Sequence, residues 1–288
     1  MNHNYLIADS GSTKTSWLFV DNEGCRTEFE PLGINPIRDS EEQIEQVLDT
    51  LTFPSARRDA CQSKKFQFST FNFYGAGCIP PYSDTLRQVL QHRFPKAEIR
   101  VESDLLGAAH ALCGRDEGVA CILGTGANSC LYDGEKIVQN TPALGYILGD
   151  EGSGAVLGKN LIGDLLKGQM SPTLLQTFHD ETGLTRTDII NKVYREPLPN
   201  RFLASLVPFL GRHRQNEDIH QFLIQNFRHF FRRNVALYRR PDLPVHFVGG
   251  VAHSYRDELH EAAQLEGFRV GRILLRPIEA LADYLLAD

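Results

Sequence analysis

The sequence has no apolar run that approaches the roughly 20 residues of a membrane span. It also has no excess of basic residues, because 30 Lys and Arg stand against 36 Asp and Glu, for a net charge of −6. Nucleic acids and anionic membranes attract basic surfaces, so this balance argues against both as partners. The chain does have a large apolar share, 42% of 288 residues, which is enough for one large domain or two of modest size.

Paired cysteines are missing as well. The six cysteines are Cys25, Cys61, Cys78, Cys113, Cys121 and Cys130. None forms a C-x-x-C spacing with another, so zinc and iron–sulfur sites find no support. The first residues are polar and lead at once into an expected strand, which predicts that there is no signal peptide. Together with cysteines that need no pairing, this predicts a cytoplasmic protein.

The most informative stretch is residues 7–15. An apolar run at residues 5–8 delivers Asp9 into a turn of glycine and hydroxyl residues, and a second apolar run follows at 17–20. A strand–turn–strand of this kind exposes backbone N–H groups that can cradle a polyphosphate. A carboxylate at the strand end can hold the Mg²⁺ that accompanies it. An ordinary Gly/Ser hairpin turn is the alternative.

The turn is rich in hydrogen-bond donors. Those expected to face a phosphate are the backbone N–H groups of residues 11–13 and the hydroxyls of Ser12, Thr13 and Thr15. Lys14 lies among them, but the G-x-x-x-x-G-K-[ST] frame of a Walker lysine is absent. Lys14 can lie near phosphate, although a solvated lysine is the simpler interpretation.

The same pattern recurs in the middle of the chain. An apolar run at 119–123 leads into a Gly/hydroxyl turn at 124–129, and an apolar stretch returns at 130–132. Two such units indicate an internal structural duplication. Mixed strands and helices with two hairpin openings predict an α/β protein of two similar halves.

Apolar periodicity and capping residues predict the remaining elements. Further strands are expected at 66–74, 97–102, 245–248 and 272–275. Helices are expected after the capping box at 40–43, around 86–90, and at 105–112, 151–166, 172–182, 185–194, 201–210, 217–239, 254–266 and 278–287.

Five expected strand ends carry glycine or acid. They lie at residues 9–15, 75–77, 103–104, 124–126 and 249–250. Ligands of open α/β sheets bind at the carboxyl ends of strands, so these ends predict a binding site. Asp104 can serve there as a helix cap or as a general base that accepts the proton of a hydroxyl nucleophile.

Acid and glycine are also dense at residues 149–154. Asp150 and Glu151 can cap the helix that follows, or a carboxylate there can bind sugar hydroxyls. The helix carries glycines at 152, 154, 158 and 163. Because each costs helix propensity, they indicate close packing against the sheet or a ligand.

Residues 9–15, 124–128 and 149–153 together resemble the sugar-kinase/actin/Hsp70 superfamily. More narrowly, they resemble the N-acetylglucosamine kinase branch of the BadF/BadG/BcrA/BcrD ATPase family, and residues 248–252 and 277–281 extend the resemblance over nearly the whole chain. It implies an α/β fold of two ribonuclease H-like (actin-like ATPase) domains around a central cleft. The domains would comprise residues 1–115, with the helix 277–288 packing back, and residues 116–276, which include a helical insertion.

The resemblance implies a role for each matching residue. Asp104 would be the catalytic base, and Asp9 would assist Mg²⁺. The residues implied for ATP are Asp9, Gly11, Ser12, Thr13, Lys14, Thr125, Gly126, Gly249, Gly250 and Ser254. The residues implied for the sugar are Asn35, Gly77, Asp104, Ala127, Asn128, Ala143, Leu144, Gly145 and Asp150. Ala127 stands where a serine is common and Leu144 where a tryptophan can stand, which bears on the choice of sugar.

The function so implied is ATP-dependent phosphorylation of the 6-hydroxyl of N-acetylglucosamine in the cytoplasm, by an enzyme that the family leads us to expect as a homodimer. A kinase for glucosamine or N-acetylmuramic acid is the nearest alternative. A second is an ATPase that activates a radical dehydratase, against which the lack of paired cysteines counts. A third is a non-catalytic sugar sensor.

Overall fold

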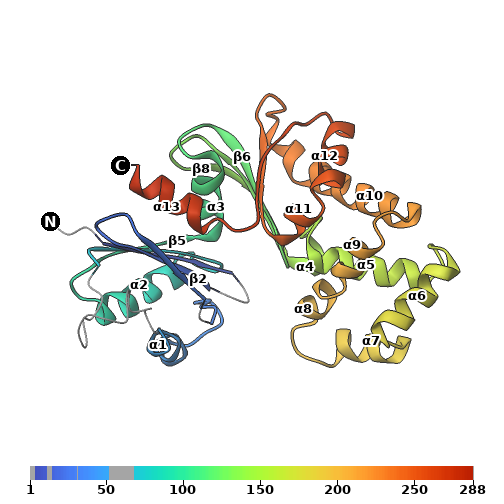
Figure 1. The fold of residues 1–288 in the computed structure, drawn as a ribbon, viewed down its shortest axis with the longest axis horizontal. Helices are drawn as coiled ribbons and strands as arrows, with labels where there is room; N and C mark the ends of the chain where they lie inside the picture. The colour runs from blue at the N-terminus through green and yellow to red at the C-terminus, as the bar shows by residue number, and fades with distance from the viewer. Residues whose placement is uncertain (1–3, 12–14, 31, 52–67, 288) are drawn as a thin grey trace. The chain divides into compact units, whose positions relative to one another are not determined.

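The computed structural model describes residues 4–11, 15–30, 32–51 and 68–287. The chain divides into two compact units, of which unit 1 comprises residues 1–114 with 277–288 and unit 2 comprises residues 115–276. Each unit contains a five-stranded mixed sheet (Figure 1). Among the helices of the described residues, none has the length and apolar character needed to cross a membrane.

The sheet of unit 1 has the strand order β3-β2-β1-β4-β5. Its first three strands form an antiparallel meander, and β4 and β5 run parallel to β1. The strands are β1 (Tyr5–Ser10), β2 (Thr15–Val20), β3 (Arg26–Phe29), β4 (Thr70–Gly75) and β5 (Glu98–Ser103). Because β1, β4 and β5 are parallel, their carboxyl ends meet at one edge of the sheet.

Both faces of this sheet are covered by helices. The helices are α1 (Glu41–Asp49), α2 (Tyr82–Arg93), α3 (Asp104–Cys113) and α13 (Ile278–Leu286). Helices α1 and α2 pack on the face that carries Leu6 and Trp17, whereas α3 and α13 lie together on the opposite face (Figure 1). Since side chains alternate along a strand, Ser10 shares the face of Leu6 and Asp9 shares the face of α3.

The sheet of unit 2 repeats this topology in the order β10-β9-β6-β7-β8. Its strands are β6 (Gly118–Leu123), β7 (Ala127–Tyr132), β8 (Ile137–Thr141), β9 (Val245–Val248) and β10 (Val270–Leu274). Again the first three form an antiparallel meander and the last two run parallel to the first. The expected duplication and the α/β fold class are therefore confirmed.

Helices fill the sequence between β8 and β9 and follow β9. They are α4 (Gly145–Leu148), α5 (Gly154–Leu166), α6 (Pro172–Thr182), α7 (Arg186–Tyr194), α8 (Pro199–Ala204), α9 (Val207–Arg212), α10 (Glu217–Arg233), the 3₁₀ helix η1 (Val235–Tyr238), α11 (Gly250–Ser254) and α12 (Arg256–Leu265). Apolar side chains of α5, α9, α10 and α12 form one core with those of β6 and β9.

Three of the expected helices are interrupted. The helix expected at 201–210 ends at Ala204, and α9 starts at Val207 with Pro208 in its first turn, where a proline costs no hydrogen bond. The helix expected at 217–239 ends at Arg233, and η1 follows. The helix expected at 254–266 starts only at Arg256, because Ser254 ends the separate helix α11. Strands β3 and β8 and helix α4 were not anticipated.

Candidate functional site

Asp9 and Asp104 lie at the carboxyl edge of the unit 1 sheet. In the strand register, Asp9 pairs with Tyr74 of β4, and Tyr74 pairs with Glu102 of β5. Asp104 follows β5 directly and is the first residue of α3. Both carboxyl groups are therefore presented by rigid elements on the α3 side of the sheet, with only β4 between them.

Both carboxyl groups resist ionisation. Burial and then the charge of Asp104 raise the pKa of Asp9 to about 7. Burial also raises the pKa of Asp104 to about 6, although the backbone N–H groups of Leu105 and of Asp104 itself donate to its carboxylate. A pair of acids with raised pKa values at a strand edge is typical of a site that handles protons or cations.

Asp104 is not the N-cap residue of α3. The N-cap of α3 is Ser103, whose hydroxyl accepts a hydrogen bond from the Leu106 amide at 3.2 Å. Ser103 thus takes the N-cap position, and the carboxylate of Asp104 lies beside it, where the amides of Asp104 and Leu105 donate to it.

The hydroxyls of the first hairpin only partly match the sequence prediction. Ser12, Thr13 and Lys14 lie outside the described residues. Thr15 is fully buried, and its hydroxyl lies 2.7 Å from the hydroxyl of Ser10. The prediction that Thr15 faces a phosphate is therefore wrong, because strand alternation turns its side chain to the face of α1 and α2. Gly11 is exposed at the end of β1, as expected for a backbone donor.

Asn35 and Gly77 are in direct contact. A Cβ atom on Gly77 would lie 2.6 Å from the side-chain oxygen of Asn35, and Gly77 has a φ of +82°. The Asn35 oxygen accepts a hydrogen bond from the Ile37 amide at 3.1 Å. This fixes the side chain and leaves its Nδ2 end without a partner among the residues that the structure describes, so it is a donor available to a ligand.

The second hairpin is held by the start of α5. The Gly154 amide donates to the Gly124 carbonyl at 2.8 Å, and the Ala155 amide donates to the Thr125 carbonyl at 3.0 Å. In a trans peptide the carbonyl and the following N–H point in opposite directions. The N–H groups of Thr125 and Gly126 therefore point away from α5, as donors to a ligand would.

Asp150 joins the second hairpin to the segment that precedes α4. Burial raises its pKa to about 6, while the backbone amides of Ala127 and Gly145 donate to its carboxylate. One of its carboxylate oxygens lies 3.1 Å from the position of a Cβ atom on Gly126. Its own amide donates to the Ala143 carbonyl at 2.9 Å. Asp150 thus binds the hairpin rather than capping α5, whose N-cap is Ser153.

The backbone around Asp150 is strained at two places. Asp150 has a φ of +53° and Leu144 has a φ of +64°, a left-handed conformation that is unfavourable for residues with a Cβ atom. The Leu144 side chain is nevertheless 64% exposed. Backbone strain of this kind clusters at functional sites.

Asn128 is oriented by a residue that the sequence analysis did not select. Its side-chain oxygen accepts hydrogen bonds from the Ser129 amide at 2.9 Å and from Asn140 Nδ2 at 3.0 Å. Asn140 lies on β8, which pairs with β7. Only the cross-strand register brings the two together, so no local motif could have identified Asn140.

The end of β9 approaches the second hairpin. Gly249 has a φ of +125°, and a Cβ atom there would lie 2.4 Å from the Leu123 carbonyl oxygen. Glycine is required at this close approach. Gly250 and Ser254, the first and last residues of α11, are exposed.

No protein-family model matches the sequence, and no curated protein matches it. Solved structures do. A protein of Porphyromonas gingivalis named "Putative N-acetylglucosamine Kinase" shares 45% identity and superposes with a TM-score of 0.91 over 99% of both chains. The chain belongs to the N-acetylglucosamine kinase-like family.

Two further structures have the same fold at lower identity. A "Putative N-acetylglucosamine Kinase" of Chromobacterium violaceum is 20% identical, with a TM-score of 0.71 over 99% of both chains. A ROK family glucokinase of Streptomyces griseus, in complex with glucose and AMPPNP, is 14% identical, with a TM-score of 0.57 over 98% of both chains. The N-acetylglucosamine kinase-like chain thus has the two-domain α/β fold of actin-like ATPases.

In this N-acetylglucosamine kinase-like chain the predicted residues that the structure describes are divided between the two units. In unit 1 they are Asp9, Gly11, Asn35, Gly77 and Asp104. In unit 2 they are Thr125, Gly126, Ala127, Asn128, Ala143, Leu144, Gly145, Asp150, Gly249, Gly250 and Ser254. In both units these residues include carboxylates, amide donors and a glycine that lies too close to a neighbouring atom to carry a Cβ atom. Phosphate and sugar recognition use groups of these kinds.

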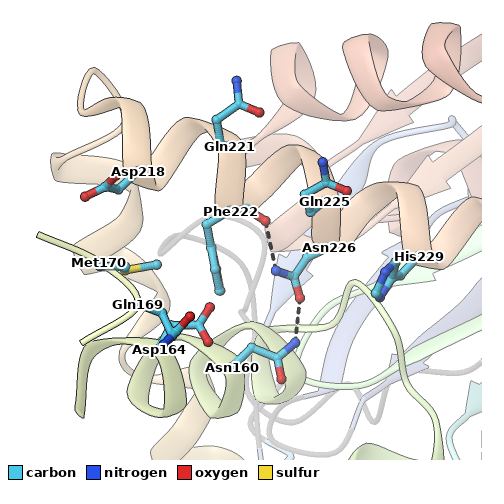
Figure 2. Close-up of a pocket in the computed structure, with 10 residues that line it drawn as sticks. All are labelled: Asn160, Asp164, Gln169, Met170, Asp218, Gln221, Phe222, Gln225, Asn226 and His229. Carbon is cyan, nitrogen blue, oxygen red and sulfur yellow. Dashed lines mark hydrogen bonds between the residues drawn. The ribbon is translucent and has the colours of Figure 1, made fainter. Parts of the chain in front are cut away.

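A cavity lies elsewhere in the N-acetylglucosamine kinase-like fold, within unit 2. It has a volume of about 440 Å³ between α5 and α10 (Figure 2). Asn160 of α5 donates to Asn226 of α10 at 2.6 Å, and Asn226 donates to the Phe222 carbonyl at 2.8 Å. The lining residues are Asn160, Asp164, Gln169, Met170, Asp218, Gln221, Phe222, Gln225, Asn226 and His229. None of them is a predicted ATP or sugar residue.

Proposed function

We propose that this chain is an ATP-dependent sugar kinase that phosphorylates the 6-hydroxyl of N-acetylglucosamine. The observation that carries the proposal is the Asp104 carboxyl group, held at the start of α3 with its pKa raised to about 6. A base with this pKa is ionised near neutral pH, and it gains more from accepting a proton than an ordinary carboxylate does. The family of the chain supports the same reaction.

Asp104 would act on the acceptor hydroxyl. Phosphoryl transfer needs little covalent chemistry from a protein, because the reaction depends on positioning and on the neutralisation of charge. The carboxylate would accept a hydrogen bond from the sugar hydroxyl and aim its oxygen at the γ-phosphorus. It would take the proton as the new P–O bond forms and as the bond from the γ-phosphorus to the β–γ bridging oxygen breaks, which releases ADP. Ser103 and the first turn of α3 hold the carboxylate in place for this step.

The hairpins would provide phosphate donors. In unit 1, the amide of Gly11 follows the Ser10 carbonyl, which accepts a hydrogen bond from the Ala76 amide at 2.9 Å. The Gly11 N–H group therefore points away from the Ala76 turn. In unit 2, the amides of Thr125 and Gly126 are turned outward in the same manner.

Asp9 fits the role of a residue that assists the binding of Mg²⁺. Its carboxylate is costly to ionise, and a divalent cation would offset that cost. No group of three or more His, Cys, Asp or Glu side chains suited to a metal occurs among the described residues. This agrees with Mg²⁺ chemistry, in which one or two carboxylates, substrate phosphates and water share the ion. When bound, Mg²⁺ would neutralise charge on the phosphates.

The sugar would be held through polar groups of known orientation. Asn35 would donate through Nδ2, which has no partner among the described residues, and Asp150 would accept through a carboxylate whose position is fixed by the amides of Ala127 and Gly145. The exposed Leu144 would contact an apolar part of the sugar. Leu144 and Ala127 are the residues that we expect to bear on which amino sugar is accepted.

The test is a panel of amino sugars assayed for ATP-dependent ADP release with the purified protein. We expect turnover with N-acetylglucosamine and weaker turnover with glucosamine and N-acetylmuramic acid. The site of phosphorylation is read by NMR of the product. Turnover with none of the sugars would contradict the proposal and favour a sensor, and a preferred substrate other than N-acetylglucosamine would contradict the choice of sugar.

A further inference from the structure

Ser10 is buried at the point where three loops of unit 1 meet. Its relative exposure is 0%, and it is the last residue of β1. The adjacent residue, Asp9, belongs to the proposed magnesium side, but the side chain of Ser10 points to the opposite face of the sheet.

The hydroxyl of Ser10 uses its full hydrogen-bonding capacity. It donates to the Ile34 carbonyl at 2.8 Å and accepts from the Ile34 amide at 3.0 Å. Its third partner is the Thr15 hydroxyl at 2.7 Å. Because the single proton of Ser10 goes to Ile34, Thr15 must donate in this pair. One buried hydroxyl therefore joins the hairpin, through Thr15, to the loop that carries Asn35.

A backbone hydrogen bond also connects Ser10 to a third segment of unit 1. The backbone carbonyl of Ser10 accepts from the Ala76 amide at 2.9 Å. The turn that contains Ala76 also contains Gly77, which is in contact with the Asn35 side chain. Ser10 thus contacts the segments on both sides of Asn35, so a shift of β1 or of the hairpin changes the position of the proposed sugar ligand.

We propose that Ser10 is a positioning residue that couples nucleotide binding at the first hairpin to sugar binding at Asn35. This inference rests on the proposed function. Nucleotide bound beside β1 and β2 would hold Thr15, Thr15 would hold Ser10, and Ser10 would hold Ile34 and Asn35 in the sugar-binding arrangement. Bound sugar would act back on the hairpin with the same coupling free energy, because coupling between two binding sites is reciprocal.

The experiment measures the dissociation constant of N-acetylglucosamine by calorimetry, with and without saturating AMPPNP and Mg²⁺. In the unaltered protein we expect the nucleotide to tighten sugar binding by roughly 5-fold or more, at the lower end of typical coupling. In Ser10→Ala, the ratio of the two constants should approach one. Thr15→Val, which leaves the Ile34 bonds intact, should lower the same ratio and serves if Ser10→Ala does not fold.

Ser69→Ala is the matched control. The Ser69 hydroxyl also connects two segments of unit 1, since it donates to the Asn4 carbonyl at 3.2 Å, but these two residues precede β4 and β1 and so lie at the other end of these strands from Ser10. It should lose some thermal stability and keep the coupling ratio. An unchanged ratio in Ser10→Ala and Thr15→Val, or a ratio of one in the unaltered protein that binds both ligands, would overturn the inference. Failure of the unaltered protein to bind either ligand would instead overturn the proposed function, and the inference with it.

Discussion

Asp9 lies on β1 and Asp104 directly follows β5, with β4 between these two strands, and burial and then the charge of Asp104 raise the pKa of Asp9 to about 7. The two carboxyl groups therefore share one weakly screened environment on the α3 side of the sheet. Burial alone raises the pKa of Asp104. The cost of ionising the pair is present in the free protein, and a cation or a substrate hydroxyl would reduce it.

Replacing Asp104 with asparagine should separate chemistry from binding. Asp104→Asn keeps an acceptor for the sugar hydroxyl but cannot take its proton, so kcat should fall by about 100-fold or more. The dissociation constant for N-acetylglucosamine should change only a few-fold. Steady-state kinetics and calorimetry measure the two quantities. Asp84→Asn, on the exposed side of α2, is the control. A near-normal kcat in Asp104→Asn would refute the assignment of Asp104 as the base.

The pH dependence of kcat/KM should report both acids. Each must be ionised to act, so kcat/KM should fall as the pH decreases through about 7 and then about 6, the pKa values of Asp9 and Asp104. Excess Mg²⁺ should move the first of these transitions to lower pH, because a divalent cation favours the carboxylate form of Asp9. The measurement is kcat/KM against pH at limiting and at saturating Mg²⁺. A profile that is flat down to about pH 5 would contradict the raised pKa values.

The same shifts predict an effect on stability. A folded-state pKa above the unfolded value means that folding favours the neutral acid, so the stabilisation is complete below about pH 4 and is lost as the pH rises through about 7. Asp9→Asn removes the cost of ionisation. It should be more stable than the unaltered protein at about pH 8, by on the order of 2 kcal/mol, and no more stable at about pH 4.

This comparison is made by urea unfolding without nucleotide or metal. Asp84→Asn, an exposed acid in an ion pair with Arg87, should show no such gain at about pH 8. Equal or lower stability of Asp9→Asn at about pH 8 would show that the carboxylate carries no ionisation cost.

Asp150 can be tested with substitutions that separate charge from backbone strain. Asn tolerates a positive φ better than Ala does, so Asp150→Asn should fold with a melting temperature close to that of the unaltered protein. Its sugar affinity should fall by about tenfold or more, because a charged acceptor is lost. Asp150→Ala should lose affinity and also stability, by about 1–2 kcal/mol. Calorimetry and thermal unfolding measure these effects. Undiminished sugar affinity in Asp150→Asn would contradict its role as a ligand.

Short sequence patterns were sufficient to predict the hairpins, the helix cap and the strand ends, because these features depend on residues that are close together in the sequence. Both hairpins, the capping box of α1 and the strand ends at 75–77 and 103–104 follow from glycine, acid and apolar residues at fixed spacings. Strands β3 and β8 were missed because they are mostly exposed or half-buried and lack a continuous apolar run. Pairing with β2 and β7 makes them strands, and pairing is not visible in a single sequence.

The residues of the candidate site likewise divide into those that a local sequence signal identifies and those that it does not. Asp9, Asp104 and Asp150 could be selected because an acid at a strand end or beside glycines is a recognisable local signal. Ser10 and Asn140 could not, since their partners Ile34 and Asn128 lie 24 and 12 residues away. Thr15 was misassigned for the related reason that the direction of a side chain depends on the strand register.

Gly158 and Gly163 of α5 can be compared to test whether a glycine in this helix is needed for packing. A Cβ atom on Gly158 would lie 2.0 Å from the Leu203 carbonyl oxygen of α8, whereas a Cβ atom on Gly163 would have nothing within 4 Å outside its own helix. Gly158→Ala should therefore force α8 away and destabilise the protein by more than about 1 kcal/mol. Gly163→Ala should stabilise it by about 0.5–1 kcal/mol through helix propensity. Urea unfolding measures both variants. A Gly158→Ala protein as stable as Gly163→Ala would mean that this glycine does not serve helix packing.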